Sequence, residues 1–343
     1  MLVTLIMPIY NQERYLRDAL EMALGQTYAD LEVLAVDDGS TDSSPEILRE
    51  YADRDRRLRI VTQKNRGLLG ANVTGIRHAK GDYVCFYDSD DEIGSDFVSS
   101  FAELVDRSYD FIARGLVFRS NDKNTAFPLA RDELLQADDL RRLSGDYVLA
   151  NNLKMDNKLF VSRCNKLYRR SCLASFVDEY DKCLGVSLGE DSIFTYLLLN
   201  HASLARIVSE PSSYVYITRD DSMTHDVDLD AHIAKCDRTF EAFSDVIASC
   251  QGDLTPALLL YYSQLFPLLG LIARRKDGYR GWKLLYERLL ASERFTEAAA
   301  KAYEHCNHSV VTAWLIYHHC PAWAYWHLWR FDHVFKTLRD RSN

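Results

Sequence analysis

The chain has 343 residues, a formal net charge of −9, 47% hydrophobic residues and 27% charged residues. This composition is typical of a globular protein with one large domain or two moderate ones, and it excludes a disordered chain. The negative charge argues against general binding of nucleic acid. The N-terminal stretch MLVTLIMPIYNQ has no basic region and no cleavage site, so we expect a first strand there and not a signal peptide.

The sequence contains eight cysteines. None of them has the C-x-x-C spacing of a zinc site, and several lie in apolar runs, which indicates reduced thiols in a cytoplasmic protein. No uninterrupted apolar run reaches the roughly 18 residues that a membrane-spanning helix needs.

The first 90 or so residues alternate between apolar, β-rich runs and helical patterns. We expect strands at 2–7, 31–36, 58–62 and 83–87, and helices at 13–24, 44–52 and 69–79. Strand and helix alternating at this spacing predict an α/β fold, a Rossmann-like and mostly parallel sheet with helices on both faces. The turn after the first strand, PIYNQER, contains no glycine, so neither a dinucleotide-binding G-x-G-x-x-G nor a P-loop is present there.

The remaining chain divides into a mixed part and a helical part. In the mixed part we expect a helix at 95–105, a strand at 111–118, a polar loop at 121–132, a strand or turn pair followed by a short helix within 157–173, a helix at 188–199 and a strand at 206–219. Long helical patterns with few glycines begin near Asp228. We therefore expect a first domain at 1–225 and a helical C-terminal region at 226–343.

Polar clusters follow each of the first four predicted strands: PIYN, DDGS, NRG and DSDD. The carboxyl ends of parallel strands meet at one edge of a sheet, and ligands bind beyond that edge. The four clusters together predict a binding site there.

The fourth cluster places four acidic residues directly after the apolar run YVCFY. Carboxylates that lose water repel one another and need a cation. In an extended segment Asp88 and Asp90 point the same way, and their hard oxygens suit Mg²⁺ or Mn²⁺, ions that share phosphate oxygens with a substrate. We therefore predict a divalent cation carrying a diphosphate. We expect Asp91 and Glu92 to cap the next helix.

Four segments, LIMPIYN, VDDGSTD, NRGLLGANVTGIRHAKGDYVCFYDSDD and GEDSIF, resemble in order and spacing the motifs of the inverting family 2 glycosyltransferases with a GT-A fold. The resemblance covers about residues 1–225. It implies transfer of a sugar from a nucleoside-diphosphate sugar, usually of uridine, to a hydroxyl of a saccharide or lipid-linked acceptor. It also implies a place in bacterial surface-polysaccharide synthesis.

The same resemblance assigns roles at the nucleotide. Pro8 and Tyr10 stand where the family holds the nucleobase, and Asp38 stands where an acid hydrogen-bonds the base. Asp88 matches the acid that touches the ribose or the metal, and Asp90 matches the metal ligand under the diphosphate.

For the chemistry, Asp191 in GEDSIF matches the catalytic base. A carboxylate can take the proton of the acceptor hydroxyl late in its attack. A helix N-terminus favours an ionised Asp191, whereas Glu190 beside it has the opposite effect. His225 matches a position that often contacts the diphosphate or the metal.

The chain departs from the family pattern after the third strand, where Asn72 replaces an arginine that often reaches the nucleobase or the phosphates. The departure weakens the uridine assignment, and Arg66 and Arg77 are candidates to compensate. The basic run NKLYRR (165–170) is interpreted as a solvated strand end, with contact to an acceptor phosphate as the alternative.

The C-terminal stretch 310–341 places four tryptophans among histidines and basic residues: Trp314, Trp323, Trp326 and Trp329. This pattern suits a peripheral contact with the inner face of the cell membrane, and it equally suits a helical cap or a homodimer interface. Two other functions stay open: a nucleotidyl or other nucleotide-sugar transferase, and a catalytically silent scaffold. The presence of both Asp90 and Asp191 argues against the scaffold.

Overall fold

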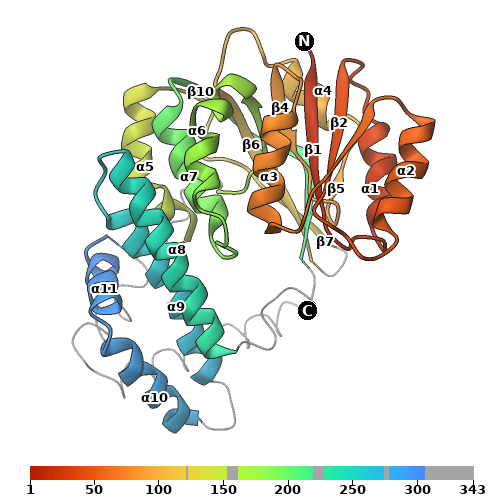
Figure 1. Cartoon of the computed structure of the whole chain (residues 1–343). Coiled ribbons are helices and arrows are strands. Elements are labelled where there is room, and N and C mark those ends of the chain that lie inside the picture. Colours follow the sequence, from red (N-terminus) through yellow and green to blue (C-terminus); the bar gives the residue numbers. More distant parts are fainter. Residues whose placement is uncertain (121–122, 153–160, 219–227, 274–277, 306–343) are drawn as a thin grey trace. The chain divides into compact units, whose positions relative to one another are not determined.

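The computed structural model describes residues 1–120, 123–152, 161–218, 228–273 and 278–305 (Figure 1). These residues belong to two compact units, the first made of residues 1–120, 123–144, 161–218 and 228 and the second of residues 145–152, 229–273 and 278–305. No sequence pattern indicated that 145–152 would group with the later helices. The tryptophan-rich stretch 310–341 lies outside the described residues.

A mixed sheet, ten-stranded in the described part of the chain, forms the centre of the first unit. Its main path has the order β3-β2-β1-β4-β9-β6-β10-β5, with β7 beside β6 and β8 beside β10. The strands are β1 Val3–Ile9, β2 Leu31–Asp37, β3 Leu58–Thr62, β4 Tyr83–Phe86, β5 Glu92–Ile93, β6 Phe111–Ser120, β7 Lys123–Phe127, β8 Glu133–Gln136, β9 Lys166–Arg169 and β10 Leu204–Ile217.

Strand directions bring many strand ends to one edge of this sheet. Strands β3, β2, β1 and β4 are parallel to one another. Strand β9 is antiparallel to both β4 and β6, and β10 is parallel to β6. One edge of the sheet, the lower edge in Figure 1, therefore contains the carboxyl ends of β1–β4, β6 and β10 together with the amino end of β9. We call this edge the carboxyl edge.

Helices cover both faces of the sheet. On one face, the core that contains Val3, Leu5 and Met7 also contains residues of α1 (Leu16–Leu24), α2 (Ser44–Arg54) and α4 (Phe97–Ala102). The other face carries α3 (Gly67–His78), α6 (Arg170–Asp181) and α7 (Glu190–His201). There a Cβ on Gly75 of α3 would lie 2.5 Å from the Ile6 side chain, and the rings of Phe86 and Phe194 are 5.9 Å apart.

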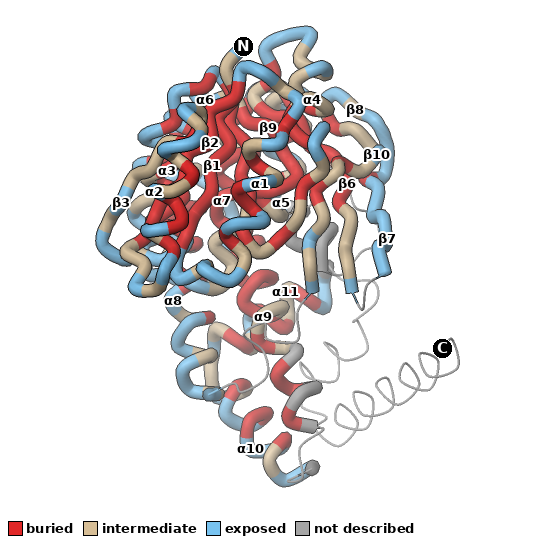
Figure 2. The backbone as a smooth tube through the Cα atoms, turned by 90° about the vertical axis from the view of Figure 1, so that its right-hand side faces the viewer, coloured by how far each residue is buried: buried red, intermediate tan, exposed pale blue. Residues whose placement is uncertain are grey.

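The local sequence explains these elements. Every residue of β1 and of β2 is buried, as strands covered on both faces require, and Figure 2 shows the two strands in the interior. Helix α1 buries Leu16, Ala19, Leu20 and Ala23, which share one side of a helix. The predicted α/β class with helices on both faces is confirmed.

Residues 123–132 do not form the polar loop that was expected at 121–132, because they contain β7. All five residues of β7 are exposed, so the strand lacks the apolar pattern by which strands are recognised (Figure 2). Strand β8 and helix α5 (Ala137–Asn152) were also not predicted.

The second unit contains α8 (Leu229–Ser249), α9 (Thr255–Ala273), α10 (Gly278–Leu290) and α11 (Glu293–His305). The hydroxyl of Tyr261 on α9 and Nη1 of Arg294 on α11 each donate to Oδ1 of Asp237 on α8 at 2.8 Å. In residues 228–273 and 278–305 the predicted helical pattern is confirmed. Within the described ranges, none of the helices combines the length and apolarity needed to cross a membrane.

Candidate active site

The loops after β2 and β3 fit closely against each other. Gly39 has φ +75°, and a Cβ there would lie 3.1 Å from the Asn65 nitrogen and the Gln63 carbonyl oxygen, so glycine is favoured for both conformation and space. Oδ1 of Asp37 accepts a hydrogen bond from the backbone N–H of Ser40 at 2.9 Å. Asp37 therefore stabilises the turn that presents its neighbour, Asp38.

Asp38 is 2% exposed and is fixed from the loop after β3. Its Oδ1 accepts hydrogen bonds from Nε2 of Gln63 at 2.6 Å and from the backbone N–H of Arg66 at 2.8 Å. The Arg66 guanidinium itself points elsewhere and donates to Asp181 of α6 at 2.7 Å. Gln63, which sequence reasoning missed, thus orients the predicted base-binding acid.

The two arginines proposed to compensate for Asn72 are both bound to α6. Arg77 pairs with Asp178 and Asp181, and Arg66 also pairs with Asp181. Asn72 itself is 1% exposed, and neither atom of its amide group has a hydrogen-bond partner among the described residues. The structure thus places buried, unsatisfied polar atoms where the family pattern has an arginine.

Pro8 and Tyr10 lie at the end of β1. Pro8 is buried and follows Ile6, which forms with Phe86 the last residue pair between β1 and β4. Because proline has no N–H, this position beyond the last pair costs no hydrogen bond between the two strands. Tyr10 is 46% exposed. With Asp38 and Asp88, these residues lie at the carboxyl edge, as the strand pattern predicted.

The acidic loop after β4 is tied to β10. The Tyr214 hydroxyl donates to Oδ2 of Asp91 at 2.6 Å, and the backbone N–H of Ile217 donates to Oδ1 at 2.9 Å. Asp91 is 5% exposed, and its burial raises its pKa to about 7, with a further contribution from the charges of Asp88 and Asp90. Asp91 therefore has a structural role that fixes the loop to the sheet.

The expectation that Asp91 and Glu92 cap the next helix is wrong. Helix α4 follows Asp96, and Glu92 belongs to β5, where its carboxylate pairs with Arg119 at 2.5 Å. The acidic run is followed by a short strand that pairs with β10, and this long-range pairing determines where both side chains go.

The other two acids of this loop are Asp88 and Asp90. Both are partly buried, and Oδ2 of Asp88 accepts a hydrogen bond from the Cys164 thiol at 3.2 Å. In the described ranges, no third His, Cys, Asp or Glu completes a compact donor set with them. Two carboxylates fit Mg²⁺ or Mn²⁺, because these ions commonly take their other ligands from water and substrate phosphates.

A buried arginine, Arg163, pairs with two acids of the site. Arg163 precedes β9, so it lies at the carboxyl edge, and it is 3% exposed. Its Nη1 donates to Oδ1 of Asp191 and lies 3.6 Å from Oε1 of Glu190. Burial raises the pKa of Asp88, and the charge of Arg163 acts in the opposite direction. The positive charge expected near the acidic loop is thus provided in part by the guanidinium of Arg163.

Asp191 and Glu190 form the first turn of α7 and differ in exposure. The Asp191 side chain is 35% exposed and that of Glu190 14%. Burial raises the pKa of Glu190 to about 6; the charge of Asp191 adds to this shift and that of Arg163 opposes it. Gly189, with φ 80°, precedes them and starts the helix. The more accessible acid of the pair is therefore the one predicted as the base.

The interpretation of NKLYRR as a solvated strand end is wrong for its first four residues, which are buried. Lys166 is fully buried, and its Nζ donates to the Ser162 carbonyl at 2.5 Å and to Oδ1 of Asn165 at 2.7 Å. Burial lowers the pKa of Lys166 to about 7. Strand β9 is inserted between β4 and β6, and this position buries a segment whose basic residues suggested a surface. Arg163, which precedes β9, was not predicted as a site residue for the same reason: the position of β9 in the sheet cannot be inferred from local composition.

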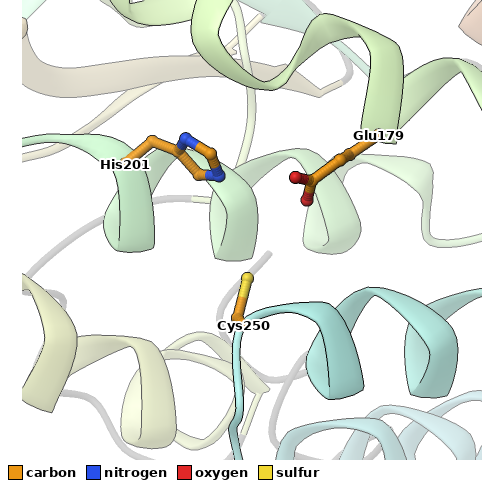
Figure 3. Close-up of side chains that lie close together, drawn as sticks. All are labelled: Glu179, His201 and Cys250. Atoms are coloured by element: carbon orange, nitrogen blue, oxygen red, sulfur yellow. The ribbon is translucent and has the colours of Figure 1, made fainter.

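The predicted ligand His225 lies outside the described residues. Another histidine, His201, lies beside Glu179 in the first unit, and the ligand atoms of the two are within 4.8 Å (Figure 3). Nδ1 of His201 is 3.1 Å from the Ser175 hydroxyl oxygen, and its ring is 5.5 Å from that of Phe176. His201 ends α7, about 15 Å along the helix from Asp191, so these contacts join α6 to α7 away from the candidate base.

A mixed sheet flanked by helices, with acids at its carboxyl edge, is the architecture of GT-A glycosyltransferases. The structure superimposes on that of TarS from Staphylococcus aureus with a TM-score of 0.60 and 17% identity, over 88% of this chain and 84% of that chain. The family model described as Glycosyl transferase family 2 matches residues 4–176. The chain belongs to glycosyl transferase family 2.

Curated relatives support the family and differ in length. Glycosyltransferase GlyA of Streptococcus pneumoniae is 40% identical over 126 residues, which are 36% of this chain and 18% of GlyA. The uncharacterized glycosyltransferase EpsJ of Bacillus subtilis is 29% identical over 262 residues, 74% of this chain and 73% of EpsJ. The chain thus spans less than a fifth of the first relative and about three quarters of the second.

Proposed function

We propose that the chain transfers a sugar from a nucleoside-diphosphate sugar to a hydroxyl of a saccharide or lipid-linked acceptor, with inversion at the anomeric carbon. The observation that carries the proposal is the position of Asp38, Asp88 and Asp191 at one sheet edge, where Asp191 is paired with the buried Arg163. A donor site and a proton acceptor are the two parts that such a transfer needs.

For the donor, we assign the nucleobase to Pro8, Tyr10 and Asp38. The neighbour TarS was solved with UDP-GlcNAc, which supports a uridine nucleotide and an N-acetylhexosaminyl or hexosyl donor here as well. Asp38 is preoriented by Gln63, so it can accept a hydrogen bond from a base without first reorganising.

For the diphosphate, Asp88 and Asp90 would hold Mn²⁺ or Mg²⁺. A cation held there would supply positive charge that offsets the negative charge of the diphosphate. The burial of Asp88 supports this assignment, because a partly buried carboxylate beside a second one is stabilised by an added cation. His225 is retained as a further candidate ligand.

For the transfer, Asp191 accepts the proton of the acceptor hydroxyl. The hydroxyl oxygen forms its bond to the anomeric carbon, while the bond from that carbon to the diphosphate oxygen breaks and its electron pair leaves with the nucleotide. A single displacement of this kind needs one base and no protein nucleophile. Arg163 holds the Asp191 carboxylate in one orientation, which favours a fixed base at the acceptor side.

The larger context follows from the family. We assign nucleotide binding and chemistry to residues 1–225, and acceptor, membrane or oligomer contacts to residues 226–343. A role in bacterial surface-polysaccharide synthesis, in the cytoplasm or peripherally at the inner face of the membrane, is consistent with this division.

The test is a screen of nucleotide sugars in which release of the nucleoside diphosphate is measured with Mn²⁺ and with EDTA. We expect release from one donor class, its loss in EDTA, and its loss in the Asp191→Asn variant. Release that persists in EDTA would remove the cation from the proposal. Equal release by Asp191→Asn would remove the base. Failure to bind any nucleoside diphosphate would contradict the proposed function as a whole.

A further inference from the structure

Three aromatic residues, Phe118, Phe127 and Tyr216, form a cluster that we call the aromatic platform. The ring of Phe118 lies 5.0 Å from that of Phe127 and 5.4 Å from that of Tyr216, between centroids. The three rings come from β6, β7 and β10, three adjacent strands of the sheet. They are therefore held by the sheet and not by a loop.

Strand register places the three rings on one face of the sheet. Tyr216 pairs with Phe118 across the β10–β6 ladder, and Phe118 pairs with Thr125 across the β6–β7 ladder. Phe127 is two residues from Thr125, and residues two apart on a strand share a face. Thr125 therefore lies on the platform face as well.

A close approach of the chain at Gly115 fixes the outer ring. A Cβ on Gly115 would lie 2.5 Å from the Phe127 carbonyl oxygen and 3.0 Å from Cα of Pro128. The absence of a side chain at this position lets the end of β7 lie directly against β6 and brings Phe127 onto Phe118.

One ring of the platform is partly buried against the core, and the other two are exposed. Phe118 packs against the cluster that contains Leu116 and Tyr214, which are 2% and 0% exposed. Phe127 and Tyr216 are 39% and 44% exposed. Exposed aromatic rings on a rigid strand lose little conformational freedom when a ligand covers them, so they are suited to binding.

The platform adjoins the candidate active site. Phe118 and Tyr216 lie near the carboxyl ends of β6 and β10, the edge that also holds Asp88 and Asp90. Tyr214, two residues before Tyr216 on β10, and Ile217, the residue after it, both donate hydrogen bonds to Asp91. Burial raises the pKa of Tyr216, and the charges of Asp91, Asp90 and Asp88 act in the same direction.

We propose that the aromatic platform binds a pyranose ring of the saccharide acceptor. One face of a pyranose presents C–H groups that pack on aromatic rings, while its hydroxyls need polar partners at the rim. The platform offers both, since Tyr216 and Thr125 carry hydroxyl groups on the same face. The inference rests on the proposed function, because it uses the acceptor as the ligand that must reach this edge.

The test is binding of simple glycosides measured by saturation-transfer NMR. The probes are the methyl β-glycosides of glucose, galactose and N-acetylglucosamine, offered to the full chain with UDP and Mn²⁺. We expect saturation of the ring protons of at least one glycoside, and binding about tenfold weaker in Phe127→Ala and in Tyr216→Ala, since each removes one ring contact. Tyr216→Phe should bind with intermediate affinity, because it keeps the ring and removes the hydroxyl.

Leu134→Ala is the matched control. Leu134 is 46% exposed on β8, which pairs with the amino-terminal part of β10 and so lies at the opposite edge of the sheet. It should bind the glycosides as the wild type does.

The outcomes separate the inference from the proposed function. Two outcomes would overturn the proposed role of the aromatic platform: unchanged glycoside binding in both alanine variants, or no glycoside binding by a wild type that binds UDP. Neither outcome would contradict the proposed transferase function. A change in the sedimentation of the variants without a change in glycoside binding would show that a second copy of the chain covers the platform, and it would also overturn the inference. Loss of UDP binding by the wild type would contradict the proposed function itself.

Discussion

Nη1 of Arg163 is hydrogen-bonded to Oδ1 of Asp191, and the arginine is the buried partner, with 3% of its side chain exposed against 35% for the aspartate. The asymmetry determines what each substitution does. Removing the aspartate leaves a buried charge that Glu190, 3.6 Å away, still compensates. Removing the arginine leaves two neighbouring carboxylates without their cation.

The first prediction concerns stability. Arg163→Met should lower the free energy of unfolding by about 3–5 kcal/mol, the usual cost of removing one partner from a buried ion pair. Arg49→Met is the control, because the Arg49–Glu46 pair is 66% exposed on both sides and an exposed pair contributes at most about 1 kcal/mol. Urea denaturation of both variants measures the difference. Equal losses in the two would show that Arg163 is not the centre of a buried network.

The second prediction concerns the cation. Asp90→Ala should abolish the part of UDP affinity that depends on Mn²⁺, because the diphosphate then lacks its compensating charge. Calorimetry of UDP with Mn²⁺ and with EDTA checks this.

Glu92→Gln is the control for the cation, since Glu92 lies two residues further on but pairs with Arg119 outside the predicted donor set. Its UDP affinity should keep the full dependence on Mn²⁺. An Asp90→Ala variant that also keeps that dependence would assign the cation to other residues.

The sequence predicts the parallel half of the sheet well because its signal is local. Strands β1–β4 are apolar runs separated by helices with their own periodicity, and the acids that follow them reach the carboxyl edge through strand direction alone. Asp88 and Asp90 could be proposed on this basis, whereas Asp38 was selected within its cluster by the family resemblance. Strand β7 could not, because an edge strand with every residue exposed has no apolar pattern.

Features that depend on strand order were missed for a different reason. Arg163 and Lys166 precede and begin β9, and only the insertion of β9 between β4 and β6 makes them interior. Asp91 could equally have been a cap or a ligand from its sequence, and its contacts with Tyr214 and Ile217 arise from residues more than 120 positions away. Local composition does not contain such pairings.

The third prediction concerns pH. Burial lowers the pKa of Lys166 to about 7. In the unfolded chain a lysine keeps its proton up to a pH of about 10, so between about 7 and 10 the unfolded state binds more protons and stability rises with pH. The free energy of unfolding of the wild type relative to Lys166→Met should therefore increase by about 1–3 kcal/mol from pH 7 to pH 9. Denaturation at the two pH values measures it.

Lys80→Met, at an exposed lysine, is the control and should show no such increase. The double difference excludes the other groups that titrate in this range, since they are common to all three proteins. A difference between the wild type and Lys166→Met that does not change with pH would mean that Lys166 stays charged in the folded state.

The fourth prediction concerns Asp191 and Glu190, which share one guanidinium but differ in exposure. Asp191→Asn keeps the shape of the side chain and removes the proton acceptor, so turnover should fall by about 10²–10⁴-fold. UDP affinity should remain unchanged, because the base contributes mainly in the transition state. Glu190→Gln keeps Asp191 and should reduce turnover much less. Single-turnover transfer to the acceptor, measured together with UDP affinity, separates binding from chemistry. If Glu190→Gln were the more damaging change, the more buried acid would be the base, and Asp191 would serve to orient Arg163.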